Sequence, residues 1–140
     1  MEIDVDLAKQ QSADNPVYYV QYAHARIAGI LSQASERGLS LQDGEAVEAL
    51  LIHPAELALI RKMLLLPELV ETIADSREPH HLPHYAMDLA TSFHDFYEKC
   101  RVLNDEEPAM TQARLQLCAA AKVVLARSLD LMGMTAPERM

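Results

Sequence analysis

Apolar residues recur at three- and four-residue steps along most of the chain, which is the spacing of one face of a helix. Proline, glycine, asparagine and aspartate interrupt this pattern and indicate where the segments begin and end. The prediction is helices over residues 16–35, 44–51, 54–66, 67–77, 84–103 and 109–132. No strand-like alternation competes with them, so we expect an all-α, single-domain bundle of five to six helices.

The segments outside the helices complete the expected organisation. Residues 1–14 are a lead-in, residues 15–132 form the bundle, and residues 133–140 form a C-terminal tail. The stretch from Pro79 to Pro83, rich in histidine and proline, is expected to be a linker.

The first predicted helix has two faces of different composition. With about 100° between successive residues, one face collects the apolar side chains of a core: Val20, Ala23, Ile27, Ile30, Leu31 and Ala34. The opposite face carries Tyr18, Tyr22, Arg26, Gly29 and Gln33. Tyrosine rings can stack on unpaired bases and arginine can hold a phosphate, which favours a recognition surface. Packing against another helix or a missing domain would explain the same pattern.

The long helix in the second half of the chain repeats this arrangement. Its core stripe consists of Leu82, Tyr85, Leu89, Phe93, Phe96 and Cys100. Tyr97 lies at the edge of the stripe, with His94 and Arg101 on the same flank. An aromatic ring beside basic groups could bind a nucleotide; the alternative is a core tyrosine whose hydroxyl meets water. The last predicted helix is apolar on more than one side, which places it at the centre of the bundle.

Charge restricts the kinds of ligand that the chain can bind. The 140 residues include 12 basic and 21 acidic side chains, for a net charge of −9. This balance excludes a broad basic platform that grips a nucleic-acid backbone. The acid is concentrated in residues 43–78, with 3 basic and 8 acidic groups, whereas residues 99–140 carry 6 basic and 5 acidic groups. A module that reads a few unstacked bases through tyrosines therefore remains compatible with the charge.

The motifs of common active sites are missing from the sequence. There is neither a glycine-rich phosphate loop nor a nucleophile elbow. The histidines His80, His81, His84 and His94 suggest a metal cluster, but no carboxylate or cysteine completes a familiar ligand set, so we expect a solvated linker and no metal. Cys100 falls on an apolar stripe and is expected to be an inert core thiol.

Targeting signals are missing as well. The acidic N-terminus lacks the basic region of a signal peptide, and the most apolar stretch, residues 63–66, is too short to span a bilayer. We therefore expect a cytoplasmic protein that does not enter the membrane.

Three stretches of the chain resemble one known protein family. The first is the run Asp14-Asn15-Pro16-Val17-Tyr18-Tyr19-Val20-Gln21-Tyr22-Ala23-His24-Ala25-Arg26. The second is Asp88-Leu89-Ala90 followed by Phe93-His94-Asp95-Phe96-Tyr97 and Arg101-Val102-Leu103, and the third is Ala136-Pro137-Glu138-Arg139-Met140. In order and spacing they are similar to the C-terminal anticodon-binding domain of arginyl-tRNA synthetases. The resemblance implies the helical DALR anticodon-binding fold and docking of the anticodon region of the arginine tRNA.

The resemblance also implies which residues meet the anticodon loop. They are Tyr22, Arg26, Tyr97 and Met140, to which we add three neighbours: Tyr18, Gln21 and Arg101. Tyr18 and Gln21 have a second possible role, facing the catalytic domain. The expected partners are the anticodon stem-loop of the arginine tRNA and that catalytic domain, in a protein that is otherwise a monomer.

The chain departs from the family in one large respect. It contains no HIGH-type motif, and Lys62-Met63 is followed by two leucines, so no KMSK-type motif is present either. The resemblance places ATP and magnesium in the missing catalytic domain, so this chain has no cofactor and should not charge tRNA alone. It would be an excised fragment or a free-standing paralogue. Two other readings remain open: a helical protein-interaction or dimerisation bundle without RNA binding, and an independent enzyme.

Overall fold

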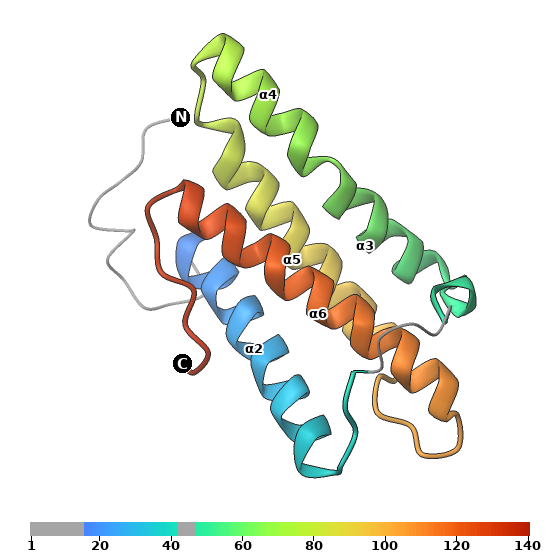
Figure 1. Cartoon of the computed structure of the whole chain (residues 1–140). Coiled ribbons are helices and arrows are strands. Elements are labelled where there is room, and N and C mark those ends of the chain that lie inside the picture. Colours follow the sequence, from blue (N-terminus) through green and yellow to red (C-terminus); the bar gives the residue numbers. More distant parts are fainter. Residues whose placement is uncertain (1–15, 42–46) are drawn as a thin grey trace.

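The computed structural model describes residues 16–41 and 47–140, and over these ranges the chain is helical without strands (Figure 1). The elements are α2 (Pro16–Glu36), the 3-10 helix η1 (Glu48–Leu50), α3 (Pro54–Leu64), α4 (Leu66–Ser76), α5 (His81–Lys99) and α6 (Pro108–Leu131). The expected all-α fold is confirmed. The lead-in at residues 1–14 lies outside the described residues. None of the described helices is long and apolar enough to cross a bilayer.

The helix α6 was expected at the centre of the bundle, but it has a solvent-facing side on which Val123 is 68% exposed. It packs against α2, α5, α3 and η1, while α3 and α4 follow one another along α5 (Figure 1). The apolar faces predicted for α2 and α5 lie in the core between the helices, where Phe93, Phe96, Ile27 and Leu89 are completely enclosed and Leu31 is partly buried. Leu131, at the end of α6, is exposed as well.

The end of α2 is closed by a hydrogen-bonded turn around Gly38. The amide of Leu39 donates to the carbonyl of Ala34 at 2.9 Å, and the amide of Gly38 donates to the carbonyl of Ser35 at 3.0 Å. These two bonds form a Schellman motif, which needs a left-handed residue at the position of Gly38. Gly38 has φ +76°, a conformation that costs glycine little, so this glycine ends the helix.

Both predicted ends of the long helix in the second half of the chain were wrong. The helix expected over residues 84–103 begins at His81 and ends at Lys99. Pro83 therefore lies within the first turn, where a missing amide proton costs nothing, and not in a linker. Beyond the end of the helix, the backbone amide of Asn104 donates to Oγ1 of Thr111 at 3.0 Å, and that hydroxyl donates to the carbonyl of Asn104 at 2.9 Å. These contacts with α6 hold the segment outside the helix, and sequence periodicity does not reveal them.

The helix expected over residues 44–51 is also shorter in the structure. Within the described residues only the single turn η1 forms there, and residues 42–46 lie outside the description. Leu51 follows the turn with φ −81° and ψ 85°, which is not helical.

A buried ion pair joins three separate parts of the chain. Glu56, which is 0% exposed, accepts a hydrogen bond from Nε of Arg114 at 2.8 Å. Its second oxygen accepts from the amide of His53 at 2.9 Å and so caps the start of α3. Arg114 also donates from Nη1 to the carbonyl of Arg101 at 2.8 Å. Both charges are thus hydrogen-bonded, which is the condition under which burial of an ion pair is tolerated.

We expect Glu56→Ala to lower the free energy of unfolding by about 3–5 kcal/mol, because it leaves the Arg114 guanidinium without its buried partner. Urea unfolding followed by circular dichroism measures this loss. Glu71→Ala, at an exposed position on α4, is the control and should change stability by less than about 0.5 kcal/mol. A loss for Glu56→Ala as small as that of the control would contradict the prediction.

We also expect both cysteines to resist thiol reagents in the folded chain at pH 8. Burial raises the pKa of the Cys118 thiol to about 12, so almost none of it is thiolate, and burial also raises the pKa of Cys100, which lowers its thiolate fraction. The thiols are also covered by the core. Reaction with Ellman's reagent should release little thionitrobenzoate before urea is added and two equivalents afterwards. Rapid modification of the native chain would mean that the core opens readily.

Candidate functional site

A surface hollow of about 440 Å³ lies where α2 crosses α5. We call it the aromatic hollow and define it by its lining: Tyr18, Tyr19, Tyr22, Arg26, His94, Tyr97 and Glu98. The first four residues come from α2 and the other three from α5. The packing of these two helices therefore brings together the two aromatic surfaces that the sequence placed on separate helices.

The rings of the hollow are held by contacts with the core and with one cation. Tyr97 stacks on the buried ring of Phe93, with centroids 6.1 Å apart and an interplanar angle of 28°. The guanidinium carbon of Arg26 lies 4.4 Å from the centroid of the Tyr97 ring, within cation–π range. Tyr22 is 42% exposed and presents ring surface to solvent. The aromatic hollow therefore contains the Tyr97 ring, which Phe93 and Arg26 hold in place, and the accessible ring of Tyr22. The guanidinium of Arg26 joins α2 to α5 across it.

His94 forms part of the hollow's wall beneath the tyrosines. Its ring centroid is 5.4 Å from that of Tyr19 and 6.1 Å from that of Tyr22. Burial, followed by the nearby Arg26 guanidinium, lowers the pKa of His94 below its usual value, although Glu98 opposes this shift. The ring is accordingly neutral at pH 7, and the formal charges of the lining are those of Arg26 and Glu98. Nε2 of His94 is buried and has no hydrogen-bond partner among the described residues.

The structure places the predicted site residues in three groups. Tyr18, Tyr22, Arg26 and Tyr97 line the aromatic hollow together. Arg101 lies in a neighbouring hollow of about 550 Å³, which also includes Tyr97. The remaining two predicted residues, Gln21 and Met140, are associated with the C-terminal tail and do not line the aromatic hollow.

The C-terminal tail lies against α2 (Figure 1). Gln21 donates from Nε2 to the carbonyl of Thr135 at 2.9 Å, and Nδ1 of the buried His24 is 2.8 Å from the carbonyl of Pro137. Lys122 on α6 pairs with Glu138 at 3.0 Å. Met140, at the end of this tail, is 51% exposed. Gln21 thus holds the tail by a hydrogen bond, a role that residue spacing did not suggest.

Sequence reasoning did not identify Tyr19 and Glu98 as members of the hollow. At about 100° from Tyr18 on the helical wheel, Tyr19 falls between the core face and the recognition face of α2, so periodicity assigns it to neither. Its hydroxyl is 3.4 Å from Oγ1 of Thr91 on α5. Glu98 follows Tyr97 directly, and only its position on the crossing helix indicates that it borders the same hollow.

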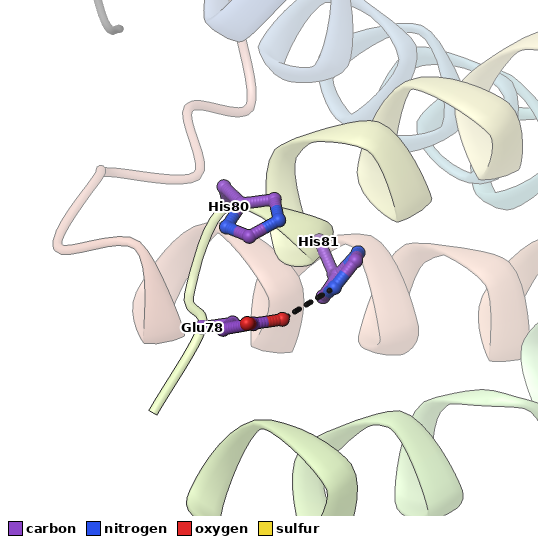
Figure 2. A group of neighbouring side chains, drawn as sticks. All are labelled: Glu78, His80 and His81. Atoms are coloured by element: carbon purple, nitrogen blue, oxygen red, sulfur yellow. Dashed lines mark hydrogen bonds and ion pairs between the residues drawn. The ribbon is translucent and has the colours of Figure 1, made fainter. Parts of the chain in front are cut away.

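A histidine cluster lies at the start of α5, away from the aromatic residues. Figure 2 shows Glu78, His80 and His81, each with a possible ligand atom, and all three atoms lie within 4.8 Å of one another. Nε2 of His81 is 3.3 Å from a carboxylate oxygen of Glu78, and the two imidazole rings are 4.2 Å apart. The structure thus brings the Glu78 carboxylate beside two of the four histidines, while the expectation that no metal binds here stays a prediction.

Comparison with known proteins identifies relatives along the whole chain. The family model described as the DALR anticodon binding domain matches residues 20–140. An arginine–tRNA ligase from Dehalococcoides mccartyi is 56% identical over 140 residues, which cover 100% of this chain and 25% of that protein. An arginine–tRNA ligase from Heliobacterium modesticaldum is 52% identical over 145 residues, covering 100% of this chain and 26% of that protein.

Solved structures agree with these relatives. The arginyl-tRNA synthetase of Thermus thermophilus superimposes with a TM-score of 0.73 at 34% identity, covering 95% of this chain and 22% of that one. The arginyl-tRNA synthetase of Plasmodium falciparum superimposes with a TM-score of 0.77 at 28% identity, covering 95% and 22%. The chain thus spans about a quarter of the length of its curated relatives. Because the family model extends over most of its residues, the chain belongs to the DALR anticodon binding domain family.

Proposed function

We propose that this chain binds the anticodon loop of the arginine tRNA and holds unstacked bases of that loop in the aromatic hollow. The observation that carries the proposal is the meeting of Tyr22 and Arg26 from α2 with Tyr97 from α5 in one exposed concave site. Proteins read RNA sequence mostly in single-stranded loops, whose bases can be splayed out and stacked on aromatic rings. Family membership and the names of the relatives support the same assignment.

Each side chain of the hollow has a distinct part in this proposal. Tyr22 and Tyr97 supply the stacking surfaces, each contributing about 1–3 kcal/mol of binding free energy. Arg26 holds a base edge or the neighbouring phosphate while its guanidinium rests on Tyr97. Tyr18 extends the wall of the hollow, and Arg101 contacts the RNA beside the hollow.

The C-terminal tail assists this binding from the side of α2. Gln21 positions the tail by its bond to Thr135, and Met140 at the tail's end completes the contact with the loop.

The remaining steps of tRNA charging belong to parts of the relatives that this chain does not span. We propose that the chain works as part of an arginine–tRNA ligase, next to a catalytic domain that binds ATP and magnesium. The whole protein would join arginine to its tRNA in the cytoplasm, as a monomer. By itself the chain then binds RNA without catalysing aminoacylation.

We expect Tyr22→Ala and Arg26→Gln each to weaken binding of an arginine tRNA anticodon stem-loop by about tenfold, because each removes a stacking or charge-assisted contact. Tyr22→Phe keeps the ring and should retain most of the affinity. Fluorescence anisotropy of a labelled stem-loop measures the dissociation constants. Arg127→Gln on α6 is the charge-matched control, since Arg127 is exposed and pairs locally with Asp130.

Two results would contradict the proposal. The first is unchanged affinity in both Tyr22→Ala and Arg26→Gln, which would place the RNA elsewhere. The second is a wild-type chain that binds no stem-loop but dimerises as its concentration rises, measured by light scattering, which would favour an interaction bundle.

A further inference from the structure

A second hollow continues the aromatic hollow toward the end of α2. Its volume is about 550 Å³, and it shares Tyr97 and Glu98 with the first. The side chains that distinguish it are Arg37, just beyond α2, and Lys99 and Arg101, where α5 ends. We call this second hollow the basic groove and define it by Arg37, Lys99 and Arg101. Since Tyr97 borders both hollows, a ligand can pass from one to the other over this single ring.

The basic groove differs in charge from the rest of the chain. Its lining contains three basic side chains and one acid, Glu98, although the chain as a whole carries −9. Lys99 is partly neutralised, because its ammonium group lies 2.9 Å from the carboxylate of Asp95. The two arginines therefore provide most of the attraction for an anion. Guanidinium groups present several N–H donors in a fixed plane, which suits phosphate.

Both arginines extend from a backbone that is held in place. The amide of Arg37 donates to the carbonyl of Gln33 at 3.2 Å within the closing turn of α2. The carbonyl of Arg101 accepts from Arg114, whose charge is paired with buried Glu56. Nε of Arg101 donates to the carbonyl of Leu103 at 3.2 Å, which orients the side chain and leaves its terminal amino groups as further donors. A site whose backbone is already ordered loses less entropy when it binds.

We propose that the basic groove binds the phosphate next to the base held in the aromatic hollow, so that the RNA backbone crosses Tyr97 and continues between Arg37 and Arg101. This inference rests on the proposed function and adds a second subsite to it. Contacts to bases determine which sequence is bound, whereas contacts to phosphate determine position and make affinity depend on salt. This division of roles explains how an acidic chain can bind RNA, because the arginines of the basic groove lie beside the stacking rings of the aromatic hollow.

The salt dependence of binding tests this subsite separately from stacking. The dissociation constant of the 140-residue chain for an arginine tRNA anticodon stem-loop is measured at several salt concentrations. We expect Arg37→Gln and Arg101→Gln each to reduce the slope of log affinity against log salt by about 0.7, the value for one phosphate contact in a single strand. Tyr22→Ala should weaken binding and leave the slope unchanged. Arg127→Gln, which removes the same charge elsewhere, should change neither quantity.

A neutral linkage in the RNA locates the contact. One methylphosphonate, moved along the loop, should lower the slope for the wild-type chain at the position whose phosphate lies in the basic groove. The same substitution should have no further effect on Arg37→Gln, because the contact is already lost.

The outcomes distinguish the two proposals. If Arg37→Gln and Arg101→Gln keep the wild-type slope while Tyr22→Ala weakens binding, the basic groove is not a phosphate subsite and the aromatic hollow stands. If Arg127→Gln lowers the slope as much as they do, the effect is one of net charge and the subsite is also refuted. If Tyr22→Ala and Arg26→Gln leave binding unchanged, the proposed function itself fails.

Discussion

The buried pair of Glu56 and Arg114 is the interaction on which the rest of the structure depends. A carboxylate with no exposed surface must have its oxygens hydrogen-bonded, and here the partners are the amide that opens α3 and a guanidinium on α6. The same guanidinium holds the carbonyl of Arg101 just past the end of α5. One charge pair in the core therefore aligns α3 with α6 and also fixes a wall of the basic groove.

The two hollows show how short-range contacts can outweigh an unfavourable total charge. Net charge acts over the whole molecule and is screened within about 10 Å at ordinary salt concentrations, whereas stacking and hydrogen bonding act at contact. The aromatic hollow contains one cation and one acid, with His94 kept neutral by burial and by Arg26. A ligand bound mainly by stacking is then little affected by the acidic residues in the middle of the chain.

Much of the candidate site could be predicted from helical spacing. Tyr18, Tyr22 and Arg26 lie on one side of α2, and the structure places that side at the hollow. Tyr97 was predicted at the rim of the α5 core stripe and lies there. Tyr19 was not predicted, because it lies between the two faces of α2 and helical periodicity assigns it to neither. Its place in the hollow depends on the angle at which α5 crosses α2, a property of two helices together.

The sequence by itself determined the helices of the bundle and which side of each is apolar, because capping, helix propensity and periodicity act within a few residues. Gly38 ends α2 for such a local reason. The tertiary structure alone decided that α5 stops at Lys99, since the following segment is held by Thr111 and Arg114 of α6. It also decided that α2 and α5 share one hollow and that Gln21 holds the tail. These outcomes depend on contacts between residues far apart in the chain. The free energies of such contacts cannot be derived from the sequence pattern within one helix.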